Sequence, residues 1–227
     1  MLPIYPQGRP FFSVIIATYN RMHLLVRAMD SVVDQQEMDW ELLVVDDGSS
    51  DRTDLRVLAY INDTQHRIRY LFHTHRGVAH SRNAGIMAAV GHYVTFLDSD
   101  DWYKPDHLRL IRTYLRAHPE ALVLQTGLTV QGNPYVPDVY RPGKLIHVKE
   151  CAAAGTLVFR KEVLIRLGGF PDVTFAEDAR LMEKVRRAGI PVHTLPQETY
   201  VYDRSRNEGI TAAAAYLFLP KRAPANR

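Results

Sequence analysis

Two patterns of apolar residues alternate along the first half of the chain. A continuous β-branched and aromatic run lies at 11–20, and further segments typical of strands lie at 40–47, 68–74 and 92–98. Each is followed by a segment with apolar residues at helical spacing, at 21–35, 51–63, 77–90 and 105–118. The runs are typical of strands buried on both faces, and the spaced segments are typical of amphipathic helices. Four strand–helix units in succession predict an α/β fold with a mostly parallel central sheet flanked by helices.

The alternation breaks after residues 121–130. Segment 131–145 is rich in Pro, Gly and Tyr, which predicts an irregular excursion rather than another strand–helix unit. Beyond it we expect a short strand and a helix within 155–170, a helix at 177–189 that ends at Gly189, and a strand at 191–203. This second segment is too small to bury a core alone, so residues 1–227 are predicted to form one domain.

Composition narrows the class of protein. The 227 residues are 46% hydrophobic and 23% charged, which is typical of a globular chain. The net charge is only +3 and the arginines are scattered over the predicted helices, so no nucleic-acid partner is expected. The pI near 9.0 nevertheless favours anionic ligands or an anionic membrane surface.

Cysteine usage and hydropathy bear on the compartment. Cys151 is the sole cysteine, which excludes an internal disulfide and suits a reducing environment. No apolar run approaches the roughly 20 residues that span a bilayer, and residues 1–12 lack the pattern of a signal peptide. We therefore expect a cytoplasmic protein, with peripheral contact with the inner face of the membrane left open.

A polar cluster ends each of the four predicted strands. The clusters are ATYN at 17–20, DDGSSDRT at 46–53, HTHRG at 73–77 and DSDDW at 98–102. In an open parallel sheet, ligands bind beyond the carboxyl ends of the strands, where such clusters meet. Helix capping is the alternative for single residues: Asp51 or Ser50 would cap one helix, and Asp106 another. Four clusters at one edge favour a binding site.

Carboxylates crowd the end of the fourth run. Asp98 and Asp100 lie two positions apart, so they point to the same side if the extended conformation continues that far. Such a pair is a half-site for a hard divalent cation, which takes further ligands from substrate phosphates and cancels the repulsion between the acids. His73 and His75 would share one strand face, but no third ligand is evident there. Neither a dinucleotide-binding glycine motif nor a Walker motif is present.

Five ordered blocks carry a resemblance to a known family. They are SVIIATYNR at 13–21, LLVVDDGSSDRT at 42–53, GVAHSRNAGI at 77–86, YVTFLDSDDW at 93–102 and GGFPDVTFAEDARLMEKVRRAG at 168–189. Together they resemble the family 2 glycosyltransferases of GT-A fold. The resemblance implies a metal-dependent, inverting hexosyltransferase that uses a nucleoside-diphosphate sugar, with UDP favoured, and Mn²⁺ or Mg²⁺. Its acceptor would be a saccharide or glycolipid of cell-surface polysaccharide synthesis.

The resemblance also implies roles for individual residues. The nucleotide-sugar-binding positions would be Thr18, Tyr19, Asp46, Asp47, Arg82, Asn83 and Asp98. Within this set, Thr18 and Tyr19 correspond to the loop that contacts the base, and one carboxylate of the Asp46–Asp47 pair would accept the ring N–H of the nucleobase. Residues 11–102 would then be the nucleotide-binding half, 103–211 the acceptor-side half and 212–227 a tail.

The metal and catalytic positions follow in the same way. Asp98 and Asp100 match the metal-binding D-x-D motif, and Asp178 matches the general base. Glu177 would lie on the acceptor side, although acids at a helix start also complement the helix dipole. Trp102 would stack on a sugar on the acceptor side or simply wall the pocket.

The C-terminal part of the resemblance is loose. Arg204, Arg206 and Asn207 fall where the family often has a loop that closes over the diphosphate, but its usual histidine is missing. The Q-x-x-R-W motif of processive members is missing too, which indicates transfer of a single sugar. The tyrosines of 133–143 would form an acceptor-side flap or pack a loop.

Two other classes of function predict features that this sequence does not have. A non-catalytic sugar-nucleotide-binding module would be expected to lose the carboxylates, and here they are all present. A sugar-1-phosphate nucleotidyltransferase would need a basic, glycine-rich first loop, which residues 17–25 do not supply.

Overall fold

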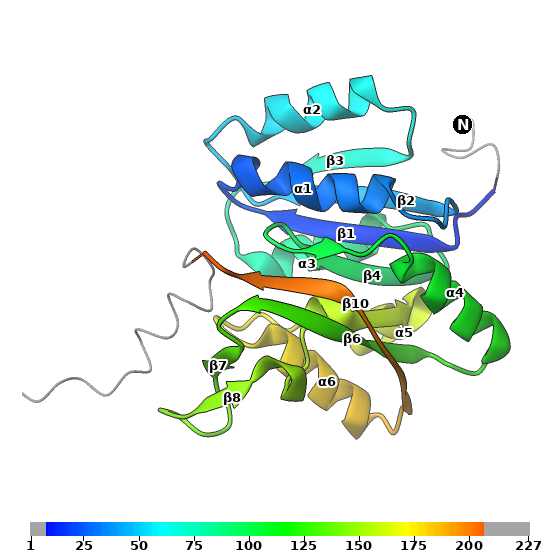
Figure 1. Ribbon diagram of the computed structural model, residues 1–227, viewed down its shortest axis with the longest axis vertical. Helices are drawn as coiled ribbons and strands as arrows, with labels where there is room; N and C mark the ends of the chain where they lie inside the picture. Colours follow the sequence, from blue (N-terminus) through cyan, green and yellow to red (C-terminus); the bar gives the residue numbers. More distant parts are fainter. Residues whose placement is uncertain (1–7, 207–227) are drawn as a thin grey trace, which may run out of the picture.

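An eight-stranded sheet with strand order β3-β2-β1-β4-β9-β6-β10-β5 forms the centre of the computed structural model, which describes residues 8–206 (Figure 1). The strands are β1 (Phe12–Thr18), β2 (Trp40–Asp46), β3 (Ile68–Phe72), β4 (Tyr93–Asp98), β5 (Trp102–Tyr103), β6 (Val123–Gly132), β9 (Leu157–Arg160) and β10 (Val192–Arg204). The helices are α1 (Met22–Val33), α2 (Thr53–Asp63), α3 (Val78–Ala88), α4 (His107–Ala117), α5 (Lys161–Leu167) and α6 (Glu177–Arg187). Asn207 and the predicted tail at 212–227 lie outside the described residues.

Most strands of the sheet run in one direction. β1 pairs in parallel with β2 and β4, and β2 pairs in parallel with β3. β9 is antiparallel to both β4 and β6, so β6 and its parallel neighbour β10 have the direction of β1. The register aligns Thr18 with Asp46, Asp46 with Phe72, and Ala17 with Asp98. The carboxyl ends of four strands therefore meet at one edge, and the predicted fold class is confirmed.

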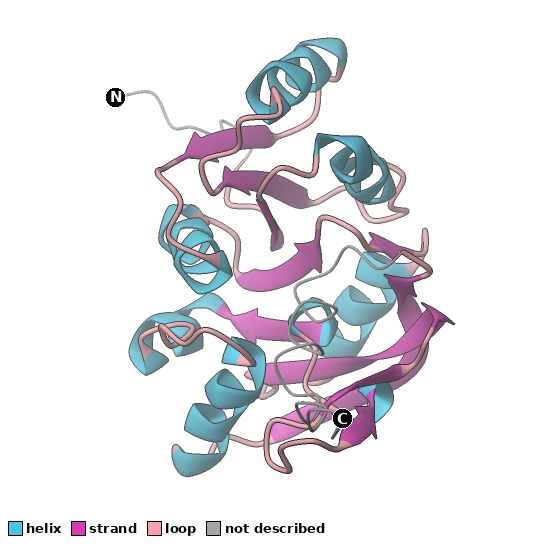
Figure 2. Cartoon of the chain, turned by 90° about the vertical axis from the view of Figure 1, so that its left-hand side faces the viewer, coloured by secondary structure: helices cyan, strands magenta, loops and turns pink. Residues whose placement is uncertain are grey.

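Helices cover both faces of the sheet (Figure 2). On one face α1, α2 and α4 pack against strand residues such as Phe12 and Val14. On the other face α3, α5 and α6 pack against residues such as Ile15 and Phe96. Successive residues of β1 thus alternate between two apolar cores, because side chains alternate across a strand. This double burial explains why the strands are uninterrupted apolar runs in the sequence.

Three local expectations differ from the structure. Segment 131–145 is not wholly irregular, because β7 (Tyr135–Pro137) and β8 (Leu145–His147) form an antiparallel hairpin. β3 ends at Phe72, so His73 and His75 lie in a loop and do not share a strand face. β4 ends at Asp98, and the Asp101 N–H donates to the Asp98 carbonyl (3.0 Å), so the chain turns where continued extension was expected.

A buried carboxylate fixes this turn to the last strand. Asp101 is 1% exposed and accepts hydrogen bonds from the Tyr200 hydroxyl and from the Asp203 N–H (2.8 Å). Burial, together with the nearby Asp100 and Asp98 carboxylates, raises the pKa of Asp101 well above its ordinary value. The buried Tyr200 ring packs against Gly155, where a Cβ would lie 2.0 Å from the ring. Position 155 therefore requires glycine. The end of β4 is thereby held against β10.

Tyr200→Phe tests this connection. The variant keeps the buried ring but removes the donor to Asp101, and we expect the free energy of unfolding to fall by about 1–3 kcal/mol. Urea unfolding measures it. The control is Tyr135→Phe, because the Tyr135 side chain on β7 is 50% exposed. This change should alter the free energy of unfolding by less than about 0.5 kcal/mol. Equal unfolding midpoints for Tyr200→Phe and the parent protein would contradict the assignment.

Candidate active site

A cavity of about 1130 Å³ opens at the carboxyl ends of the parallel strands. Its walls come from the loops after β1, β2, β3 and β4, from the β7–β8 hairpin, from the start of α6 and from the end of β10. All four polar clusters that the sequence placed at strand ends contribute residues to it. The second segment closes the cavity on the other side, with Glu177 and Asp178 in the lining.

Hydrogen bonds join the first two loops. The Asn20 N–H donates to Ser49 Oγ, and the Ser50 N–H donates to Asn20 Oδ1, both at 2.8 Å. Asp51 accepts from the N–H groups of Met22 (2.9 Å) and Thr53 (3.2 Å), the first residues of α1 and α2. Asp51 therefore binds the first N–H group of each of these two helices and ties the loop after β2 to the start of α1, although the N-cap position of α2 is Arg52.

Aromatic and polar groups form one end of the cavity. The Tyr19 ring stacks on the His75 ring, with centroids 4.0 Å apart. Asp47 accepts hydrogen bonds from the N–H groups of Arg76 and Gly77, each 2.8 Å, so it fixes the loop before α3. Thr18 Oγ1 is buried and has no hydrogen-bond partner among the described residues.

Three positions predicted to contact substrate do not line the cavity. Asp46 accepts from the Ser49 N–H (2.8 Å) and the Tyr70 hydroxyl (2.6 Å). Asn83 exchanges two hydrogen bonds of 2.8 Å with the backbone of Phe170. The Trp102 ring lies under the guanidinium of Arg27, 4.0 Å from its centroid. In the structure these side chains support the loops around the cavity, and contact of any of them with a ligand stays a prediction.

A buried guanidinium joins the two halves of the cavity. Arg82 is 5% exposed; it donates to Asp98 Oδ1 (2.6 Å) and, through its other terminal nitrogen, to Glu177. Burial alone would lower the pKa of Arg82, but the Asp98 and Glu177 carboxylates raise it above the ordinary value. Arg82 is therefore a fixed positive charge between acids that are far apart in the sequence.

Each of the crowded aspartates after β4 has a different partner. Asp98 is paired with Arg82, Asp100 with Arg21 at 2.9 Å, and Asp101 with Tyr200. Burial, with the adjacent Asp98 charge, raises the pKa of Asp100 even though Arg21 opposes the shift. The pair of Asp98 and Asp100 thus offers hard oxygen donors at the cavity wall, and each carboxylate is paired with one arginine. Such a donor set fits Mn²⁺ or Mg²⁺.

The acidic pair at the start of α6 has an unusual environment. Ala176, just before it, adopts a left-handed backbone conformation with φ of 57°, which is uncommon for a residue with a side chain. Burial and the neighbouring Glu177 charge raise the pKa of Asp178 to about 7, against the effect of Arg82. A helix N-terminus by itself stabilises a carboxylate and lowers its pKa. At Asp178 burial outweighs this effect, and a pKa raised to about 7 suits a general base at neutral pH.

Sequence reasoning missed some cavity residues and left others doubtful. Arg21 directly follows the ATYN cluster, a signal that could have indicated it as a partner for Asp100. Arg204 and Arg206 line the cavity as the loose C-terminal resemblance suggested. Tyr140 also lines it, and its hydroxyl donates to Glu183 (2.8 Å), so the hairpin is part of the wall. Burial raises the pKa of the Cys151 thiol in the lining to about 11, so the thiol stays protonated.

The fold is shared with solved structures of proteins in complex with nucleotide sugars. Staphylococcus aureus TarS in complex with UDP-GlcNAc superposes with a TM-score of 0.74 at 24% identity, over 90% of this chain and 61% of that one. Mannosyltransferase PcManGT from Pyrobaculum calidifontis in complex with GDP-Man and Mn²⁺ gives a TM-score of 0.71 at 22% identity, over 96% of this chain and 67% of that one. The fold is therefore the GT-A fold.

Residues 13–150 match the model of glycosyl transferase family 2, and the chain belongs to that family. An uncharacterized glycosyltransferase of Rickettsia felis is 42% identical over 98 residues, 43% of this chain and 16% of the relative. The UDP-Glc:α-D-GlcNAc-diphosphoundecaprenol β-1,3-glucosyltransferase of Escherichia coli is 29% identical over 165 residues, 71% of this chain and 64% of the relative. The chain thus spans only a minor part of the first of these relatives.

Within residues 8–206 we find no helix with the length and apolar character that a membrane crossing requires.

The raised pKa of Asp178 makes a prediction about stability. The folded protein holds this proton up to about pH 7, whereas the ordinary pKa is 3.8, so folding stability falls as the pH rises between these values. Asp178→Asn removes the penalty. In the absence of divalent cations and near pH 8, we expect the free energy of unfolding of the variant to exceed that of the parent by about 1–4 kcal/mol. The difference should nearly vanish near pH 4. Urea unfolding at the two pH values measures it.

The control is Asp54→Asn, an exposed carboxylate in the first turn of α2. It should change stability little at either pH. An Asp178→Asn protein that is less stable than the parent near pH 8 would contradict the environment assigned to Asp178.

Proposed function

We propose that the protein is an inverting glycosyltransferase that moves one sugar from a nucleoside-diphosphate sugar, with UDP favoured, to a hydroxyl group of a saccharide or glycolipid. One observation carries the proposal: within a single cavity, Arg82 joins Asp98 to Glu177, and Asp178 lies beside them with a pKa near 7. The cavity thus combines an oxygen-donor cation site with a separate candidate base.

Asp98 and Asp100 would hold Mn²⁺ or Mg²⁺. Both carboxylates line the cavity, and Arg21 and Arg82 keep them at its wall. The ion, when bound, would neutralise charge on the departing diphosphate. The crystallised complex of PcManGT with GDP-Man and Mn²⁺ supports this assignment.

Thr18, Tyr19 and Asp47 would form the nucleotide end. The Tyr19–His75 stack offers a flat surface for a base, and Thr18 also lines this end of the cavity. Asp47 shapes the adjacent loop through the N–H groups that it binds. The name of the E. coli relative includes UDP-Glc, and TarS was crystallised with UDP-GlcNAc. Both support uridine as the nucleoside of the donor.

Asp178 would act on the acceptor. It would take the proton of an acceptor hydroxyl, whose oxygen forms a bond to the anomeric carbon while the bond from that carbon to the diphosphate oxygen breaks on the opposite face. The anomeric configuration is therefore inverted. Glu177, held by Arg82, would orient the acceptor, and the β7–β8 hairpin would border it. The lipid diphosphate in the name of the E. coli relative supports a glycolipid acceptor in cell-surface polysaccharide synthesis.

Asp178→Asn tests the chemistry. The variant keeps the shape of the side chain but loses the proton acceptor, so transfer should fall by at least about 10²-fold. The assay incubates the protein with labelled nucleotide sugars, Mn²⁺ and saccharide or lipid-diphosphate acceptors, and measures transfer and donor hydrolysis. Donor affinity by calorimetry should be unchanged, and Glu177→Gln should be milder.

Asp54→Asn serves as the control and should transfer at the parental rate. NMR of the product from an α-linked donor should show a β-linkage. Parental transfer by Asp178→Asn, or a product with retained configuration, would refute the role of Asp178. Tight donor binding by the parent protein without hydrolysis or transfer would instead favour a non-catalytic binding module.

Asp100→Ala tests the cation site. We expect the Mn²⁺-dependent gain in UDP affinity to disappear, because the ion loses one of its two carboxylate ligands. Calorimetric titration of UDP with and without Mn²⁺ measures the gain. The control is Asp172→Ala, which removes an exposed carboxylate that also lines the cavity and should keep the gain. An equal Mn²⁺ effect in Asp100→Ala and the parent would exclude Asp100 as a ligand.

A further inference from the structure

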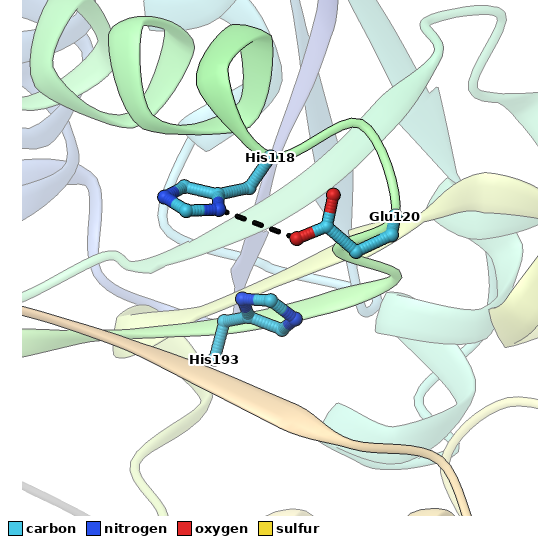
Figure 3. Close-up of side chains that lie close together, drawn as sticks. All are labelled: His118, Glu120 and His193. Carbon is cyan, nitrogen blue, oxygen red and sulfur yellow. Dashed lines mark hydrogen bonds and ion pairs between the residues drawn. The ribbon is translucent and has the colours of Figure 1, made fainter.

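Two histidines and a glutamate converge in Figure 3. They lie near the amino ends of β6 and β10, whereas the cavity lies at the carboxyl end of β10. His118 follows the last residue of α4, Glu120 lies in the connection to β6, and His193 is near the start of β10. One nitrogen of each imidazole and one carboxylate oxygen all lie within 4.8 Å of one another. His118 Nδ1 and Glu120 Oε1 are 3.2 Å apart, close to the roughly 3.4 Å that separates two ligands of a tetrahedral Zn²⁺ ion.

A tight turn presents the first two side chains. The Ala121 N–H donates to the His118 carbonyl (3.0 Å), which closes a four-residue turn over 118–121. Pro119 occupies its second position, where the fixed φ of proline suits the turn. His118 and Glu120 are therefore held in place by the backbone before any ion binds, and ligand binding costs less ordering entropy.

The third side chain is positioned by an independent contact. His193 pairs with Leu124 of β6 in the sheet, and its Nδ1 lies 3.1 Å from the Tyr114 hydroxyl. Tyr114 is one helical turn before His118, and the two rings are 4.4 Å apart. The contact with Tyr114 therefore fixes the His193 ring beside His118.

The surroundings suit a cation that keeps one open position. The site lies at the C-terminal end of α4, where the unpaired carbonyl groups make the helix dipole negative. The side chains of His118 and Glu120 are 44% and 63% exposed, so an ion can enter and water can complete its coordination. Two imidazoles and one carboxylate form a borderline donor set that favours Zn²⁺ over Mg²⁺ or Mn²⁺.

We propose that His118, Glu120 and His193 bind Zn²⁺ and thereby crosslink the end of α4 to the start of β10. The site is separate from the Asp98–Asp100 pair, because it lies near the amino end of β10 and has imidazole ligands. The far end of β10 supplies Asp203 and Arg204 to the cavity. The crosslink therefore stabilises a strand that also forms part of the catalytic wall.

The experiment measures thermal unfolding of chelator-treated protein with and without ZnCl₂. At a hundredfold excess over the dissociation constant, Zn²⁺ should raise Tm by about 5–10 °C. The rise should disappear in His118→Ala and in His193→Ala. It should persist in Asp100→Ala, which damages the other cation site, and in His66→Ala, a histidine that stacks on Trp40 outside the cluster.

A second measurement covers variants that fold poorly. Co²⁺, added as a spectroscopic substitute for Zn²⁺, should give the visible absorption of a four-coordinate ion in the parent protein. Glu120→Gln should weaken it, whereas Glu162→Gln, whose side chain is equally exposed at 63%, should not. Three outcomes would overturn the proposal. They are no rise in the Tm of the parent protein with Zn²⁺, a rise in both histidine variants as large as in the parent, or a rise that Asp100→Ala abolishes.

Discussion

The buried ion pairs of Arg82 are the interaction on which the cavity depends. Its guanidinium donates to Asp98, 16 positions away at the end of β4, and to Glu177, 95 positions away at the start of α6. The planar fork of arginine allows one side chain to bind both acids, which a lysine could not do in the same geometry. Without this charge the two carboxylates would face each other across a desolvated space, which is costly. Arg82 therefore fixes the start of α6 next to the end of β4.

Even with Arg82 in place, carboxyl groups outnumber cationic side chains among the most buried residues of the cavity. Burial raises the pKa of Asp100, Asp101 and Asp178, and neighbouring carboxylates add to each shift. A site of this kind favours a bound cation on one side and proton uptake on the other. The proposed reaction needs both, because the leaving diphosphate gains negative charge as the acceptor hydroxyl loses a proton.

β10 runs between the two proposed cation sites, the Asp98–Asp100 pair and the cluster of His118, Glu120 and His193. Its carboxyl end is tied to the turn after β4 through Asp101, and its amino end carries His193. The same strand pairs with β6 along most of its length, so its position is set by the sheet rather than by either site alone. An ion near the amino end of β10 would act on the cavity only through the stability of this strand, which is why we assign it a structural role.

The sequence alone determined the features that depend on neighbouring residues. Uninterrupted and spaced apolar patterns defined the strands and helices of the first half, and the polar clusters after the strands indicated the edge where the site lies, since both signals are local. Only the tertiary structure decided what individual side chains contact. Asn83 turned to the Phe170 backbone, and Asp101 found Tyr200, a partner 99 positions away. His118 and His193 likewise meet only because α4 ends beside β10, a juxtaposition that no local pattern encodes.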